Sequence, residues 1–322
     1  MANSQFLSAC SADAIHKAAE KLKSGHLVAF PTETVYGLGA DATNEEAVKR
    51  IYEVKGRPNN HPLIVHVASI NALETWAQDI PDYAVELARA FWPGPMTLVL
   101  KRSDVAKDFI TGSQDSVGIR VPSDPVALEL LSQFESLGGL GVAAPSANRF
   151  GQVSPTSAHD VQAELGEYLS GNDQILEGGQ SEIGIESTII DCRNLIPTIL
   201  RPGAVTKSMI NSIVLVEFAN TEESQFRVSG NYEKHYAPKA NVIINQTPKS
   251  GQAFIALSSF QTPDGVYRIS SPVNVVEFAR DIYAGMRRAD VLGFSELIIE
   301  VPEGQGVEIA LLDRVKKASN GR

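Results

Sequence analysis

One short segment of the chain has residue types that suit the binding of a small polar molecule, Phe30-Pro-Thr-Glu-Thr-Val-Tyr-Gly-Leu-Gly39. Thr32 and Thr34 are two residues apart, so their hydroxyls project to the same side where the backbone is extended. Gly37 and Gly39 allow the backbone to approach a ligand closely. The segment therefore predicts a hydrogen-bonding wall where a strand runs into a turn.

A basic loop follows this segment after one predicted helix, at 44–54. Lys55 and Arg57 come at the end of that helix, and His61 follows in a loop that two prolines stiffen. A guanidinium can hold two phosphate oxygens as a fork, and an ammonium adds a point charge. These residues are candidates to hold a triphosphate and to stabilise charge on departing pyrophosphate. The same cations would also be favourable at a helix C-terminus that binds nothing.

Two more polar side chains lie inside predicted strands. His66 alternates with apolar residues in Leu63–Val67, which is also the usual setting of a structural histidine. Arg120 lies among small and apolar residues in a predicted strand at 117–121. A buried arginine needs an anionic partner. That partner is either a carboxylate of the protein or the carboxylate of a substrate.

Later motifs repeat this combination of small residues, hydroxyls and cations. Ser146 and Ser154 lie in or after Ala-Ala-Pro-Ser-Ala-Asn, where the alanines leave room for a ligand. Ser187 and Arg201 come near the ends of two further predicted strands. Tyr236, in Lys-His-Tyr-Ala-Pro-Lys, could close over a nucleotide as a lid, or could simply anchor a linker.

Several familiar motifs are missing from the sequence. It has no Walker A string, no GxGxxG after a strand, no GxSxG elbow and no metal-ligand cluster. No residue is an obvious covalent nucleophile. An ATP site in this chain would therefore be built in another way.

Composition limits the class of protein. The 322 residues are 43% hydrophobic, which favours a globular chain of two domains. The formal charge of -10 lies wholly in residues 1–239, because residues 240–322 are neutral, and an acidic domain is a poor non-specific binder of nucleic acid. No apolar run approaches the roughly 18 residues of a membrane-spanning helix, and no secretory signal is evident. With only Cys10 and Cys192, we expect a cytoplasmic protein.

The order of predicted elements divides the chain in two. Strands and helices that alternate without a repeat indicate one α/β or α+β domain over residues 1–218. Residues 219–239 are polar and rich in flexible positions, which predicts an interdomain linker. Residues 240–322 predict a small αβα domain with a parallel sheet. Its expected strands lie at 241–244, 253–257 and 296–299, and its expected helices at 275–288 and 307–317.

Nine strings, in this order, resemble the YrdC-like threonylcarbamoyl-AMP synthases of the long, two-domain type. They are Phe-Pro-Thr-Glu-Thr-Val-Tyr-Gly-Leu, Lys-Gly-Arg-Pro, Pro-Leu-Ile-Val-His, Pro-Gly-Pro-Met-Thr, Gly-Ile-Arg-Val-Pro, Ala-Pro-Ser-Ala-Asn, Glu-Ser-Thr-Ile-Ile-Asp, Arg-Pro-Gly and His-Tyr-Ala-Pro. The resemblance covers nearly the whole chain. It implies a twisted, mostly parallel α/β sheet with a central cavity, and a smaller Rossmann-like C-terminal domain. We infer that this domain and the linker regulate access to the cavity.

The resemblance also implies a nucleotidyltransferase reaction. L-threonine and bicarbonate give N-carboxy-threonine, whose new carboxylate attacks the α-phosphate of ATP, so that threonylcarbamoyl-AMP and pyrophosphate form. A partner enzyme system then modifies tRNA with the threonylcarbamoyl group. Magnesium is expected on the triphosphate, and no metal ligands are expected from the protein.

Matching motif by motif gives the site residues that the resemblance implies. L-threonine would bind near Thr34, His66, Arg120, Ala144 and Ser187. ATP would bind near Lys55, Arg57, His61, Ser116, Ser146, Ser154, Arg201 and Tyr236. His61 departs from the family pattern, since many relatives carry lysine there.

Two other functions compete with this one. A concave YrdC-like surface could hold double-stranded RNA, although the charge of -10 argues against it. A hydrogenase-maturation carbamoyltransferase would also make a carbamoyl adenylate, but such proteins carry additional acylphosphatase-like and zinc-finger regions.

Overall fold

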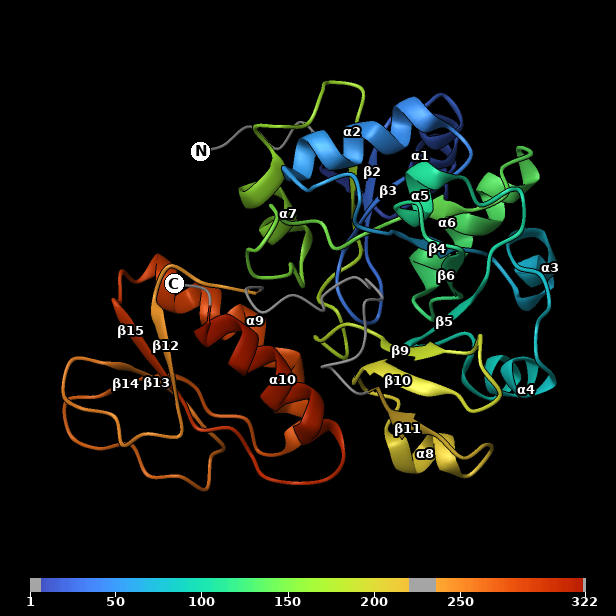
Figure 1. Cartoon of the computed structure of the whole chain (residues 1–322). Coiled ribbons are helices and arrows are strands. Elements are labelled where there is room, and N and C mark those ends of the chain that lie inside the picture. The colour runs from blue at the N-terminus through green and yellow to red at the C-terminus, as the bar shows by residue number, and fades with distance from the viewer. Residues whose placement is uncertain (1–6, 220–235, 321–322) are drawn as a thin grey trace.

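The computed structural model describes residues 7–219 and 236–320, which form two sheets flanked by helices (Figure 1). The larger sheet ends with the strand Glu217–Phe218, and the smaller sheet begins at Asn241. Most of the predicted linker, residues 220–235, lies outside the described residues. Among the residues that are described, no helix has the length and apolar character needed to span a membrane.

The larger sheet has eleven strands, in the order β1-β8-β2-β3-β7-β4-β6-β5-β9-β10-β11. They are β1 (Leu7–Ala9), β2 (Val28–Phe30), β3 (Gly37–Asp41), β4 (Ile64–His66), β5 (Met96–Lys101), β6 (Ser116–Arg120), β7 (Val142–Ala143), β8 (Gln174–Glu177), β9 (Thr188–Asp191), β10 (Thr198–Arg201) and β11 (Glu217–Phe218). The α/β class and the two-domain architecture are as predicted.

The direction of the strands differs in detail from the prediction of a mostly parallel sheet. Five neighbouring pairs are parallel and five are antiparallel, so the sheet is mixed. Strand pairs β2–β3 and β9–β10 are each joined by a short loop with no helix. Such a connection allows only antiparallel pairing, because a parallel crossover needs a dozen or more residues.

The described part of the larger domain has eight α-helices, and the one predicted at 44–54 forms at Glu45–Lys55. They are α1 (Ala12–Lys23), α2 (Glu45–Lys55), α3 (Leu73–Trp76), α4 (Asp82–Phe91), α5 (Asp108–Thr111), α6 (Pro125–Ser136), α7 (Ala158–Leu165) and α8 (Lys207–Asn211), with a 3-10 turn at Ile70–Ala72. Asn44 caps α2 by accepting a hydrogen bond from the Ala47 amide, and Gly56 ends it in the left-handed conformation. These two ends fix where the basic loop begins.

The smaller domain has a four-stranded parallel sheet in the order β12-β15-β13-β14. Its strands are β12 (Asn241–Ile244), β13 (Ala253–Ile255), β14 (Tyr267–Ser270) and β15 (Glu296–Ile299), and its helices are α9 (Val275–Val291) and α10 (Val307–Ser319). β14 was not predicted from the sequence.

Both helices of the smaller domain pack on one face of its sheet, between that sheet and the larger domain (Figure 1). The predicted three-layer αβα arrangement is therefore wrong for the described residues 236–320. The connections before β13 and β14 are short stretches rich in proline, glycine and small polar residues, and neither forms a helix for the other face. Arg268 covers part of that face instead, with its guanidinium 4.8 Å from the Phe254 ring centre.

Candidate active site

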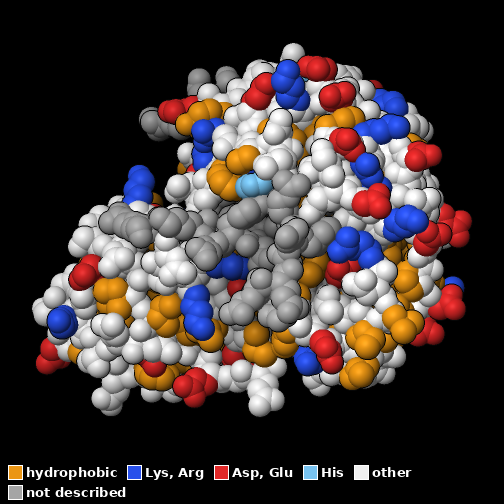
Figure 2. All heavy atoms as spheres, in the orientation of Figure 1, with side chains coloured by type: hydrophobic (Ala, Val, Ile, Leu, Met, Phe, Trp, Pro, Cys, Tyr) orange, Lys and Arg blue, Asp and Glu red, His pale blue; other side chains and the backbone are white. Residues whose placement is uncertain are grey.

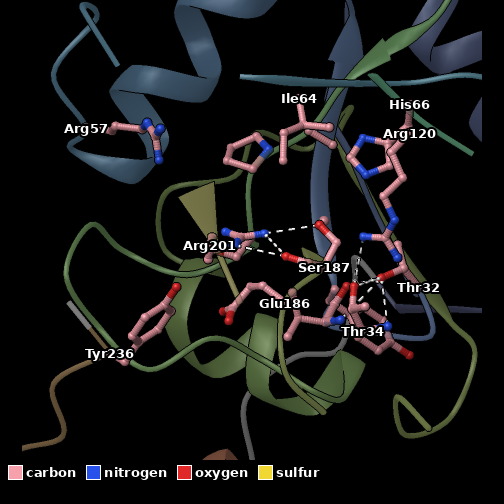
Figure 3. Close-up of a pocket in the computed structure, with 16 residues that line it drawn as sticks. Thr32, Thr34, Arg57, Ile64, His66, Arg120, Glu186, Ser187, Arg201 and Tyr236 are labelled. Carbon is pink, nitrogen blue, oxygen red and sulfur yellow. Dashed lines mark hydrogen bonds between the residues drawn. The ribbon is translucent and has the colours of Figure 1, made fainter. Parts of the chain in front are cut away.

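A pocket lies where strand ends and loops of the larger domain meet Tyr236 (Figure 3). All five residues predicted for threonine are in its wall, as are four of the eight predicted for ATP, Arg57, Ser146, Arg201 and Tyr236. The rest of the wall consists of Thr32, Val35, Tyr36, Gly37, Ile64, Pro145 and Glu186.

Figure 3 shows that the polar side chains form two groups. Arg120, His66, Thr32 and Thr34 lie at one end of the pocket, whereas Arg57, Arg201, Glu186 and Tyr236 lie at the other. Ser187 lies between the two groups. The pocket can therefore hold a small polar molecule beside a longer anionic one.

Arg120 is held at the end of β6 by partners on three sides. Its Nη1 donates to Thr34 Oγ1 at 2.9 Å, and its Nε donates to the Gly94 carbonyl at 3.3 Å. Glu33 approaches Nη2 at 2.7 Å as an ion pair, outside hydrogen-bond alignment. Both charged side chains are buried, and because they are paired, each compensates the charge of the other. Nη2 makes no hydrogen bond among the described residues, so its contact there is the ion pair with Glu33.

The two threonines of the first motif do lie together, but for a different reason from the one predicted. β2 ends at Phe30, and the chain then bends instead of continuing as a strand. Thr32 Oγ1 lies 2.8 Å from Thr34 Oγ1 and donates to the Val35 carbonyl at 2.6 Å. A tight turn, and not an extended backbone, brings the hydroxyls to one side.

His66 lies directly opposite Arg120 in the parallel pair β4–β6. Burial, and after it the nearby charge of Arg120, lowers the pKa of His66 to about 3. The ring is therefore neutral near pH 7. Its Nδ1 has no hydrogen-bond partner among the described residues.

This buried neutral histidine predicts a pH dependence of stability. Below about pH 6.5 the unfolded chain binds a proton on His66, whereas the folded chain does so only near pH 3, so the free energy of unfolding should fall as the pH drops. The slope from this group approaches about 1.4 kcal/mol per pH unit. Denaturant unfolding of the protein and of His66→Gln, from about pH 7 to about pH 5, measures the difference. Equal slopes would contradict a neutral, buried His66.

Arg201 and Ser187 form the junction between the two ends of the pocket. Arg201 Nε and Nη2 donate to the Ser187 carbonyl at 3.0 and 2.9 Å, and Nη2 also reaches Ser187 Oγ at 3.1 Å. Ser187 Oγ is 2.8 Å from Thr97 Oγ1 on β5. Burial lowers the pKa of Arg201, but an arginine stays charged under any ordinary condition. A fixed cation therefore lies beside a fixed hydroxyl.

The two cations at the end of α2 have different surroundings. Arg57 is in the pocket wall and donates to the Pro62 carbonyl at 3.0 Å. Lys55 is outside the wall, and its ammonium donates to the backbone carbonyls of Ser146 and Asn148. Burial and the charge of Arg57 lower the pKa of Lys55 well below its usual range. Lys55 thus ties α2 to the loop that carries Ser146.

Three other residues predicted for ATP are also buried but lie outside the pocket wall. His61 packs on Phe150 with ring centres 5.3 Å apart. Ser116 begins β6, four residues before Arg120, which is roughly 13 Å along a strand. Ser154 donates to Glu186 Oε1 at 2.6 Å, so it acts on the pocket through another side chain. Contact of these residues and of Lys55 with ATP stays a prediction.

Sequence reasoning missed two carboxylates of this region, Glu33 and Glu186. Both occur in motifs that were considered for their hydroxyls. The available signal was that each carboxylate has only uncharged residues for three positions on either side and lies near a strand, which predicts burial and hence a cationic partner. That partner is Arg120 for Glu33, and it is Arg314 of α10 for Glu186.

Family models match both parts of the chain. The model for the Sua5/YciO/YrdC family, described as "Telomere recombination", matches residues 20–203. A model described as "Threonylcarbamoyl-AMP synthase, C-terminal domain" matches residues 205–320.

Two relatives extend over nearly the full length. A Pyrococcus abyssi protein named threonylcarbamoyl-AMP synthase is 38% identical, over 96% of this chain and 94% of its own length. A Bacillus subtilis protein of the same name is 36% identical, over 96% of this chain and 93% of its own.

The fold is also similar to solved structures. The crystal structure of P. abyssi Sua5 complexed with L-threonine gives a TM-score of 0.87 at 36% identity and covers 98% of each chain. Escherichia coli YciO gives a TM-score of 0.51 at 22% identity over 61% of this chain and 93% of its own, which shows a shared fold alone. The chain belongs to the Sua5/YciO/YrdC family, in the form that carries the additional C-terminal domain.

Proposed function

We propose that this protein is an L-threonylcarbamoyladenylate synthase, a nucleotidyltransferase that acts on L-threonine, bicarbonate and ATP. The observation that carries the proposal is the two-ended pocket, with an arginine and a neutral histidine at one end and two arginines at the other. The names of the full-length relatives and the L-threonine in the P. abyssi structure support it.

At the first end, Arg120 would pair with the carboxylate of threonine, while Thr34 and Gly94 hold the guanidinium in position. Neutral His66, in the pocket wall, would exchange a hydrogen bond with the threonine hydroxyl through Nδ1, which has no hydrogen-bond partner among the described residues. Ala144 and Ser187 would complete the contacts around the amino group. The carbamate forms on this amino group and is labile in water. Burial of the amino group would therefore protect the carbamate until it reacts.

At the second end, Arg57, Arg201, Ser146 and Tyr236 would hold ATP, whose magnesium ion enters with it as part of the substrate. A carbamate oxygen bonds to the α-phosphorus, and the bond from that phosphorus to the bridging oxygen of pyrophosphate breaks. Arg57 and Arg201 would stabilise the negative charge that accumulates on pyrophosphate. Catalysis then comes from positioning and charge, without a covalent intermediate on the protein.

The product would pass to a partner enzyme system that modifies tRNA, in the cytoplasm. We propose that the protein itself binds nucleic acid weakly or not at all and has no membrane partner. Over the face drawn in Figure 2, lysine and arginine side chains are interspersed with aspartate and glutamate, and the chain carries a net charge of -10.

Detection of the product tests the proposal directly. Purified protein with ATP, magnesium, L-threonine and 13C-bicarbonate should yield threonylcarbamoyl-AMP by mass spectrometry, heavier by one mass unit than the product from ordinary bicarbonate. A product without the heavy carbon, or an adenylate of threonine itself, would contradict the proposed reaction.

A further inference from the structure

The nucleotide end of the pocket contains a carboxylate that conflicts with a triphosphate ligand. Glu186 lies in the pocket wall, in the segment just before β9, and is buried. Burial alone would raise the pKa of Glu186, but the charges of Arg314 and Arg201 outweigh burial and lower it to about 2. The group is therefore ionised at neutral pH and would repel phosphate unless its charge is compensated.

The compensation comes from the C-terminal domain. Arg314 Nε on α10 donates to Glu186 Oε2 at 2.8 Å, and Tyr283 on α9 donates its hydroxyl to the same oxygen at 2.9 Å. Ser154 Oγ donates to the other carboxylate oxygen, Glu186 Oε1, at 2.6 Å. Arg314 is fully buried, and its Nη2 also donates to the Pro202 carbonyl, next to Arg201, at 2.9 Å.

The same side chains support the aromatic wall. The ring of Tyr236 stacks on Tyr283 with centres 5.5 Å apart and an angle of 25° between the planes. The guanidinium of Arg314 lies 5.5 Å from the centre of the Tyr236 ring. The backbone of α9 rests directly on Gly184, where an added Cβ would lie 2.4 Å from the Cα of Arg280. The second domain is thus in direct contact with the segment that carries Glu186.

We propose that Arg314 is a positioning residue for the nucleotide end of this site. It neutralises and holds Glu186, so that this carboxylate neither repels the phosphates of ATP nor draws Arg201 away from them. The inference rests on the proposed function for the identity of the anion. Through Arg314, the C-terminal domain would make an electrostatic contribution to the pocket. The charged side chains of the pocket wall itself come from the larger domain.

The experiment compares full-length variants. Arg314→Met removes the charge at similar volume, and Glu186→Gln with Arg314→Met removes both charges. Arg287→Met is the matched control, because Arg287 on α9 also bridges the domains, to Glu164 at 3.0 Å, without a contact to Glu186. ATP dissociation constants come from calorimetry, and KM for ATP and for threonine from pyrophosphate release.

We expect Arg314→Met to weaken ATP binding by about 30-fold, the order for two unit charges roughly 8 Å apart at an effective dielectric constant of about 20. The ATP dissociation constant of the double variant should return to within about threefold of that of the parent protein, because replacing both members of a buried pair is tolerated. Arg287→Met should also stay within about threefold, and KM for threonine should change little in every variant. A double variant as weak as Arg314→Met, or equal losses in Arg314→Met and Arg287→Met, would overturn the proposal and leave a role in domain docking only.

A pH series separates charge from packing. Without Arg314, burial should raise the pKa of Glu186, although Arg201 still faces it and Tyr283 and Ser154 still donate to it. ATP affinity of Arg314→Met, relative to the double variant, should therefore improve as the pH falls from about 8 to about 6. A constant ratio would overturn the proposal. If the parent protein binds ATP but releases no pyrophosphate with threonine and bicarbonate, the proposed function fails while the binding comparison still tests Arg314.

Discussion

Arg120→Met should strongly reduce threonine-dependent turnover and also destabilise the protein by about 3–5 kcal/mol. The destabilisation follows because Glu33 and Arg120 are buried together at 2.7 Å, and removing the arginine leaves an uncompensated carboxylate in the interior. The loss of turnover follows because the threonine carboxylate loses its cation. For a buried, hydrogen-bonded charge this is expected to reduce kcat/KM for threonine by about 100- to 1,000-fold.

The two effects can be separated with Glu33→Gln. The double variant Glu33→Gln with Arg120→Met has no buried charge left at this position, so its unfolding free energy should return to within about 1 kcal/mol of the parent protein. It should still fail to use threonine. Denaturant unfolding and pyrophosphate release measure the two properties on the same samples. A stable double variant with normal kcat/KM for threonine would show that Arg120 has a structural role alone.

Arg57→Met should lower kcat by about 100- to 1,000-fold with little change in KM for threonine. Arg57 lies at the opposite end of the pocket from Arg120, where charge would develop on pyrophosphate (Figure 3). Arg57→Lys should recover part of the loss, because lysine keeps the charge but not the planar fork. Single-turnover kinetics with saturating threonine distinguish a slow chemical step from weak substrate binding.

Arg50→Met, on the helix α2 that precedes Arg57, is the matched control. Arg50 pairs with Asp173 at 2.6 Å, away from the pocket, so its loss should lower stability and leave turnover per folded molecule unchanged. An Arg57→Met variant that retains normal kcat, or one that raises KM for threonine as strongly as Arg120→Met does, would contradict the division of the pocket into two ends.

Local patterns in the sequence predict the parts of this fold that local interactions decide. The start of α1 is an example, since Ser11 accepts from the Ala14 amide at 3.1 Å as its position before an apolar stripe predicts. β3 was missed because its glycines favour a turn. An added Cβ on Gly39 would lie 2.7 Å from Val142 and 2.8 Å from the Phe30 ring, so this glycine allows a strand to pack closely.

In the site, too, local motifs were predictable from the sequence, whereas contacts between distant segments were not. The motifs identify residues that line one pocket, although they come from many strand ends, because each motif holds its own polar side chains beside a strand. The pairing of Glu186 with Arg314 joins residues 128 positions apart, and no spacing rule reports such a contact. A weaker indication did exist, because Arg314 falls on the buried stripe of α10 with Ala310, Leu311 and Ala318. A charge on an apolar face indicates a buried ion pair, but the face does not name the partner.

Pyrophosphate release, with one component omitted at a time, tests the central claim most directly. Purified protein with ATP, magnesium, L-threonine and bicarbonate should release pyrophosphate, and omission of either threonine or bicarbonate should reduce the rate to background. In the proposed reaction, threonine and bicarbonate are joined before the resulting carbamate attacks ATP. Pyrophosphate release should therefore depend on both substrates. Release that is indifferent to threonine, or no release from folded protein that binds ATP, would contradict the account.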